Sequence, residues 1–246
     1  MNLYGKTFAD LYDRHFSDYA SKATPYLLKW FSSQPVSQIQ PSILDLGCGT
    51  GQLGLRFLEA GYTYTGLDHS PHMLQKAEEK CGRFKLEGKA QFLEADFSSF
   101  KISGPFGLVV STYNSLNHLE TPEKLWGCFG SARKSLGENG LFLFDYHTRA
   151  GLKDWASVET AEWDRDKVEI KGEFNEKRAG AVMKIKGTVN DQPFEEIISN
   201  RAFPLVEIEE WLYQEGFTQV TFSELVNLGT PLSKPEEEKR VVIIAA

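Results

Sequence analysis

The chain has 246 residues, of which 41% are hydrophobic and 25% charged, which allows a sizeable core and excludes wholesale disorder. Its formal net charge of −7 disfavours nucleic acid as a partner, because surfaces that track phosphates are usually basic. No stretch approaches the roughly 20 apolar residues of a membrane span, and the start of the chain lacks a signal-peptide apolar region. Cys48, Cys81 and Cys128 show no CxxC spacing, so we expect a cytoplasmic protein without a membrane partner.

Apolar periodicity and turn residues predict alternating helices and strands up to residue 152. The expected order is helix 7–31, strand 43–46, helix 52–60, strand 62–67, helix 70–80, strand 90–94, strand 106–112, helix 121–136, a turn at 137–140 and strand 141–146. The strands are continuous apolar runs, which is typical of strands buried on both faces. Their alternation with helices predicts a parallel sheet.

The pattern changes between residues 153 and 203, where apolar and polar residues alternate between Gly, Asn and Asp turns. Such alternation indicates antiparallel strands with one solvent-exposed face. A helix at 206–214 and a last strand from residue 240 follow. We therefore predict an α/β fold, a doubly wound Rossmann-like and mostly parallel seven-stranded sheet with a small antiparallel β insertion before the last helix. The main domain would comprise residues 1–152 and 204–246, and the insertion 153–203 would be a lid or substrate platform.

A glycine-rich loop follows the first strand in "SILDLGCGTGQLG", residues 42–54. Such a loop lets a ligand approach the backbone and a helix N-terminus. Residues 49–54 fit the GxGxxG pattern of dinucleotide sites, but Asp45 stands where a pyrophosphate would have to come close. A carboxylate there disfavours an anionic ligand and favours a cationic one. S-adenosylmethionine (SAM), which carries an ammonium and a sulfonium and no phosphate, fits this requirement.

The segment "ILDLGCGTG" resembles motif I of the class I SAM-dependent methyltransferases, and the resemblance covers the chain except for the insertion. It implies SAM as the cofactor, with S-adenosylhomocysteine as its product, and Asp45, Gly47 and Gly49 around the methionine part. Asp68, at the end of the second strand, would accept from the ribose hydroxyls. In "FLEADFSSF", Asp96 would accept from the adenine amino group.

Other residues are weaker candidates for the cofactor site. Phe97 would lie near the adenine ring, with His69 and Met73 as further wall residues, although a surface and a core position are the alternatives for the last two. The N-terminal segment resembles a Tyr-x-x-x-Tyr-Asp helix that closes over SAM in related enzymes, which points to Tyr4 and Tyr12. Aromatic residues at helical spacing are, alternatively, core residues.

The acceptor is expected beyond the carboxyl ends of the strands, where ligands bind on such sheets. "STYNSLNHL", residues 111–119, resembles the loop of amino-sugar N-methyltransferases in which a histidine faces the acceptor amine. This resemblance makes His118 the catalytic candidate, with an ordinary titration near pH 6.5; a helix-capping loop with a surface histidine is the alternative. The remaining candidates are Tyr113 at the cofactor and, at the substrate, Asn114, Asn117, Tyr146 and Arg149.

Several absences narrow the class of enzyme. The chain has no NPPY or DPPY segment and no Pro-Cys nucleophile, and it has Ser111 where a catechol-type metal site needs an acid. No HExxH or Cys/His cluster indicates a metal. We therefore expect metal-free, SAM-dependent transfer of a methyl group by in-line displacement to a nitrogen or oxygen of a small-molecule acceptor. The alternatives are an NAD-linked oxidoreductase and a non-catalytic SAM-binding protein; the sequence leaves the acceptor and the oligomeric state open.

Overall fold

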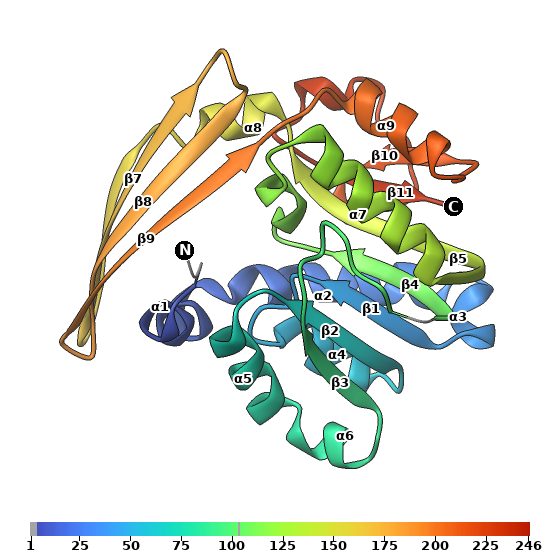
Figure 1. Cartoon of the computed structure of the whole chain (residues 1–246), viewed down its shortest axis with the longest axis horizontal. Coiled ribbons are helices and arrows are strands. Elements are labelled where there is room, and N and C mark those ends of the chain that lie inside the picture. The colour runs from blue at the N-terminus through green and yellow to red at the C-terminus, as the bar shows by residue number, and fades with distance from the viewer. Residues whose placement is uncertain (1–3, 103) are drawn as a thin grey trace.

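A computed structural model describes residues 4–102 and 104–246 and shows two sheets (Figure 1). The main sheet has seven strands in the order β10-β11-β5-β4-β1-β2-β3. These strands are β1 (Ser42–Leu46), β2 (Thr63–Asp68), β3 (Ala90–Glu94), β4 (Phe106–Ser111), β5 (Leu136–His147), β10 (Val220–Ser223) and β11 (Arg240–Ala245). All neighbours pair in parallel except β11, which runs antiparallel to both β5 and β10. The predicted fold class is confirmed.

Helices cover both faces of the main sheet, as the continuous apolar strands require. The helices are α1 (Lys6–Leu11), α2 (Asp18–Ser32), α3 (Val36–Ile39), α4 (Gln52–Glu59), α5 (Pro71–Lys80), α6 (Gly82–Leu86), α7 (Pro122–Ser135), α8 (Arg149–Lys153) and α9 (Leu205–Gln214). Buried residues of α7 and α9 form one apolar core with the sheet, and those of α2, α4 and α5 form another on the opposite face. The ends of the strands lie between these two helical layers, where only loops adjoin them.

The second sheet is antiparallel, in the order β6-β7-β8-β9, and extends beside α1 (Figure 1, yellow to orange). Its strands are β6 (Val158–Trp163), β7 (Asp166–Asn175), β8 (Gly180–Val189) and β9 (Gln192–Arg201). Its inner face forms an apolar cluster with α1, in which Phe8 and Leu11 pack near Val168 and Ile185. This packing places the second sheet against the N-terminal segment.

Three details differ from the sequence-based expectations. The predicted helix 7–31 is divided by a π-helical turn, Tyr12–Phe16, between α1 and α2. The expected turn at 137–140 belongs to β5, whose pairing with β4 shifts register there. The segment 153–203 forms four antiparallel strands, and the first of them, β6, precedes the alternating stretches at 168–174, 181–189 and 193–203 on which the prediction rested. Within the described residues, no helix has both the length and the apolarity needed to cross a bilayer.

Candidate active site

A cavity of about 540 Å³ lies at the carboxyl ends of the parallel strands, between the N-terminal segment and the second sheet. Every residue predicted to bind the cofactor lines it, and so do His118 and Asn114. The predicted cofactor residues are Tyr4, Tyr12, Asp45, Gly47, Gly49, Asp68, His69, Met73, Asp96, Phe97 and Tyr113. The fold therefore brings together residues from the carboxyl ends of β1 to β4 and the loops after them, from α5, and from the N-terminal segment with its π-helical turn.

The glycine loop presents bare backbone and one buried carboxylate to the cavity. Gly47 and Gly49 have φ angles of 77° and 53°, which L side chains rarely adopt. Asp45 is 2% exposed, and the Tyr64 hydroxyl donates to its Oδ2 over 2.5 Å. Its Oδ1 has no hydrogen-bond partner among the described residues. Burial, with the charge of Asp68 nearby, raises the pKa of Asp45 to about 7 although the Tyr64 bond opposes the shift.

Asp68 ties the glycine loop to the start of α5. The Gly49 N–H donates to Oδ2 and the Ser70 N–H to Oδ1, each over 2.9 Å. Burial raises the pKa of Asp68, against the lowering effect of these two bonds. Each carboxylate oxygen keeps a free lone pair, because such an oxygen accepts about two hydrogen bonds. Ser70, and not Asp68, caps α5, since its Oγ accepts from the Met73 N–H at 3.3 Å.

Asp96 follows β3 and lines the cavity. Its Oδ1 accepts from the Ser98 N–H at 2.8 Å, which fixes the carboxylate. Burial would raise the pKa of Asp96, but the bonds from Ser98 and the nearby Lys124 ammonium hold it below its ordinary value. Met73 is 2% exposed and belongs to the apolar cluster of α1, so it is a core residue that also reaches the cavity.

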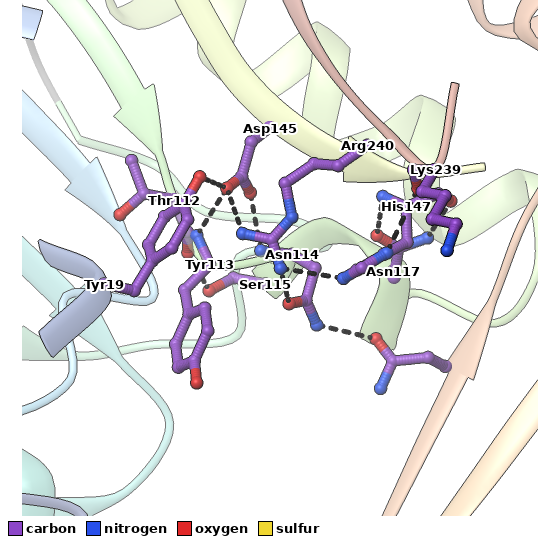
Figure 2. A network of polar contacts seen from close by, with 11 residues as sticks. Tyr19, Thr112, Tyr113, Asn114, Ser115, Asn117, Asp145, His147, Lys239 and Arg240 are labelled. Carbon is purple, nitrogen blue, oxygen red and sulfur yellow. Dashed lines mark hydrogen bonds and ion pairs between the residues drawn. The ribbon is translucent and has the colours of Figure 1, made fainter. Parts of the chain in front are cut away.

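The loop after β4 carries Tyr113 and Asn114 in the left-handed region, with φ angles of 62° and 53°. Such a conformation costs of the order of 1–3 kcal/mol and persists only where surrounding groups impose it. Asp145 supplies that constraint: its Oδ2 accepts from the Tyr113 N–H at 3.1 Å and its Oδ1 from the Asn114 N–H at 2.6 Å. Tyr19 and Arg240 donate to the same carboxylate (Figure 2).

Arg240 connects this loop to the last strand. Its Nη1 lies 3.1 Å from Asp145 Oδ2, and its Nη2 donates to Asn114 Oδ1 at 3.3 Å and to His147 Nε2 at 2.7 Å (Figure 2). The guanidinium carbon lies 4.4 Å from the centroid of the Tyr19 ring, a cation–π distance. Burial and the Arg240 charge lower the pKa of His147 to about 4, so this imidazole is neutral.

His118 ends the 3₁₀ turn η2 (Ser115–His118) and faces the cavity from below the second sheet's last strand. The Ser199 carbonyl lies 3.0 Å from Nδ1, and a carbonyl only accepts, so Nδ1 carries the proton. Nε2 therefore accepts from the Tyr4 hydroxyl at 3.1 Å. Burial lowers the pKa of His118 to about 4, in spite of the Ser199 bond, which corrects the expected titration near pH 6.5.

The N-terminal segment closes the cavity over His118. The Ser70 hydroxyl donates to the Tyr4 carbonyl at 2.7 Å, and the Gly5 N–H donates to Glu196 Oε1 at 2.7 Å. The Tyr4 ring stacks on Phe8 with centroids 5.0 Å apart. Both sheets thus hold the first described residues in place.

Three predicted substrate residues do not line the cavity. The Asn117 amide donates to the carbonyls of His147 and Arg201 at 3.0 and 2.9 Å. The Tyr146 hydroxyl, in a fully buried residue, donates to the Arg201 carbonyl at 3.1 Å. Arg149 pairs with exposed Glu176. These contacts join β5, η2 and the second sheet, which is a structural role.

Several lining residues were not predicted from the sequence: Phe8, Arg240 and, from the insertion, Asp154, Trp155, Glu159, Ile170, Met183, Ile185 and Ile198. Arg240 lines the cavity because β11 runs antiparallel to β5, which brings the first residue of β11 to the carboxyl edge of β5, and no local pattern in the sequence indicates that direction. The sequence of an alternating strand likewise does not show whether its apolar residues face a cavity or the core. In the part of the chain that the structure describes, no three His, Cys, Asp or Glu side chains are grouped so that they could hold a metal ion.

The family described as "Methyltransferase domain" matches residues 43–140. The chain is 31% identical over 220 residues to YqeM of Bacillus subtilis (strain 168), which is named a methyltransferase, and the match covers 85% of each chain. It is 26% identical over 168 residues to dTDP-3-amino-3,4,6-trideoxy-alpha-D-glucopyranose N,N-dimethyltransferase of Streptomyces venezuelae, covering 66% of this chain and 67% of that protein.

The fold also matches solved structures. A SAM-dependent methyltransferase from Clostridium acetobutylicum ATCC 824 superimposes with a TM-score of 0.76 at 21% identity. The match covers 97% of this chain and 96% of that one, so it includes the second sheet as well as the main sheet.

Proposed function

The chain belongs to the SAM-dependent methyltransferases, and we propose that it methylates a nitrogen or oxygen of a small molecule. The observation that carries this proposal is the cavity of about 540 Å³, which the glycine loop, the N-terminal segment and the second sheet line together. Ligand pockets of roughly 300–1,000 Å³ suit small molecules. The segment 153–203 would then act as the lid or platform on the acceptor side.

The residues at the glycine loop fit SAM. Asp45 Oδ1 is a buried acceptor that no described residue pairs with, and an ammonium is the group that would satisfy it. Asp68 would accept from the ribose hydroxyls through its free lone pairs, and Asp96 from the adenine amino group. A pyrophosphate would instead meet the buried Asp45, which argues against the NAD-linked alternative. Bound SAM supplies an activated methyl group on a sulfonium, which is a good leaving group.

The chain's own part in the reaction is to position the acceptor. His118 Nε2 carries a lone pair, because Nδ1–H is committed to Ser199. This lone pair can accept from the N–H or O–H of the acceptor, in place of the Tyr4 hydroxyl or through it. With a pKa of about 4 the imidazole is a weak base, so its role would be to orient the acceptor through a hydrogen bond. Holding the reacting atoms at roughly 3–3.5 Å is the main source of rate in such a transfer.

The test is turnover of methyl-labelled SAM by the purified chain against a panel of small amines and alcohols. We expect label in the product and release of S-adenosylhomocysteine with at least one acceptor. The control is Asp45→Ala, which should release neither. Turnover confined to nucleic acid or protein substrates would contradict the proposal.

Asp68→Ala should weaken SAM binding by about ten- to a hundredfold, since hydrogen bonds to a charged group contribute roughly 1.5–3 kcal/mol. Calorimetry measures the affinity, and the thermal midpoint reports whether losing the bonds to Gly49 and Ser70 also loosens the fold. Glu94→Ala is the matched control, because Glu94 pairs with Asp68 across β2 and β3 but is exposed and outside the cavity. Equal affinity in the two variants would refute the ribose assignment.

SAM binding should also depend on pH through Asp45. The ammonium pairs with the ionised carboxylate, and the pKa of Asp45 is about 7. Below that pH, Asp45 must therefore lose a proton before SAM binds. The affinity should fall as the pH falls, by about fivefold between pH 7 and pH 6 for a single group titrating at 7. In Asp45→Asn, binding should be weak and lose this dependence. An unchanged slope in that variant would assign the titration to another group.

A further inference from the structure

The acceptor side of the cavity is the part lined by the second sheet, the segment after α8 and the start of β11. Its wall is apolar and contiguous: Ile170 stands opposite Ile185 across β7 and β8, and Met183 opposite Ile198 across β8 and β9. Directly opposed side chains in a sheet lie in contact distance. A ligand body placed against these four residues would meet hydrocarbon and no hydrogen-bonding group.

Among the described residues that line the acceptor side, every charged side chain but one has an ion-pair partner. Arg240 is paired with Asp145 at 3.1 Å, and Asp154 with Lys239 at 2.5 Å. Glu159, in contrast, is an exposed residue at the rim of the cavity and makes no ion pair among the described residues, where the Ser157 hydroxyl donates to its Oε1 at 3.4 Å. Lys124, the other cation lining the cavity, acts on Asp96 at the opposite, cofactor side.

Glu159 lies beside the apolar wall, because its partner across β6 and β7 is Ile170. Trp155 lines the cavity from the segment just before β6. A carboxylate and an aromatic ring next to an apolar surface are the groups that bind an ammonium on a hydrocarbon body. A phosphate would meet the opposite: one unpaired negative charge and no unpaired cation in this part of the described chain.

We infer that the acceptor, given the methyl transfer proposed above, is a phosphate-free amine with a mainly apolar body, and that Glu159 selects for its positive charge. The ammonium form is drawn in by Glu159 and loses a proton to water before it reacts. The nitrogen lone pair then forms the new bond to carbon, sulfur keeps the electrons of the broken sulfur–carbon bond, and the methylated ammonium releases its proton to solvent. The dTDP-linked amino sugar in the name of the Streptomyces relative does not meet this description.

Binding to the chain saturated with S-adenosylhomocysteine tests the inference independently of turnover. The matched probes are tyramine and tyramine O-phosphate, which differ by one phosphate, with dTDP-glucose as a nucleotide-linked sugar. We expect calorimetry to show tyramine binding at least about tenfold more tightly than either phosphate compound, as like charges repel at short range. A preference that is absent or reversed would overturn the inference, whereas methyl transfer to a phosphorylated acceptor would leave the proposed function intact.

Charge reversal at one position then tests the role of Glu159. Glu159→Lys should reduce the ratio of tyramine to tyramine O-phosphate affinity by about tenfold or more. Glu162→Lys is the control, since Glu162 is on the same strand but points to the opposite face, pairs with Lys167 and lies outside the cavity. If both reversals change the ratio equally, the effect is one of net charge and Glu159 is not the selecting residue.

Discussion

Replacing Asp145 with alanine should lower the free energy of unfolding by about 3–5 kcal/mol, because removal of one partner strands a buried ion pair. The carboxylate is 2% exposed and accepts from Tyr19, Arg240 and the N–H groups of Tyr113 and Asn114. Without it, two backbone N–H groups in the left-handed region lose their acceptor, and Arg240, whose side chain is only 25% exposed, loses its counter-ion (Figure 2). Urea denaturation measures the change.

Two further variants separate the contributions. Asp145→Asn keeps the shape and one acceptor oxygen, so it should destabilise less than alanine but still leave Arg240 without a counter-ion. Glu176→Ala breaks the ion pairs with Arg149 and Lys153. All three side chains are exposed, so this variant should lower the free energy of unfolding by at most about 1 kcal/mol. If Asp145→Ala unfolds at the wild-type urea concentration, the network does not hold the loop after β4.

The parallel sheet and the cofactor side were predictable from the sequence for a physical reason. Strands buried on both faces must be apolar throughout, and the glycine loop must be bare where positive φ angles are needed, so both features leave a local signal. Gly47, Asp68 and Asp96 were placed by their position at strand ends, and each lies at the cavity. The edge strand β6 leaves little local signal, because most of its residues are exposed. Three of its six positions are Glu or Thr, so apolar and polar residues do not alternate along it.

Strand ends alone did not identify the acceptor side. Successive side chains of a strand point to opposite faces. On β5, Asp145 accepts hydrogen bonds from the loop after β4, whereas Tyr146 packs into the core with Phe203. The sequence analysis chose Tyr146 and passed over Asp145. The direction of β11, which decides where Arg240 lies, depends on long-range pairing that no local pattern encodes.

Burial was equally hidden at His118. The sequence placed an imidazole in a polar loop and gave no sign that Tyr4 and Ser199 would cover it. Its pKa near 4 favours orientation of the acceptor over removal of a proton from it as the proposed role of His118. The distinction has a measurable consequence in the rate and in its dependence on pH.

His118→Ala should lower kcat by about 10²- to 10⁴-fold, the usual contribution of a positioned acid–base or hydrogen-bonding group, while SAM affinity stays near the wild-type value. The imidazole is neutral at every pH above about 5, so the wild-type rate should show no limb near pH 6.5 that disappears in the variant. Single-turnover kinetics with saturating SAM measures the chemical step directly. A limb near pH 6.5 lost on mutation would show that His118 is less buried in solution than in this fold.

Two controls assign the effect to the lone pair on Nε2. Tyr4→Phe keeps the ring stacked on Phe8 but removes the hydroxyl that donates to Nε2, so it should change kcat much less than His118→Ala if the acceptor takes that hydrogen bond. His72→Ala removes an imidazole outside the cavity and should leave kcat unchanged. If His118→Ala turns over the acceptor at the wild-type rate, the imidazole is a structural link to Ser199, and holding the two substrates close together accounts for catalysis.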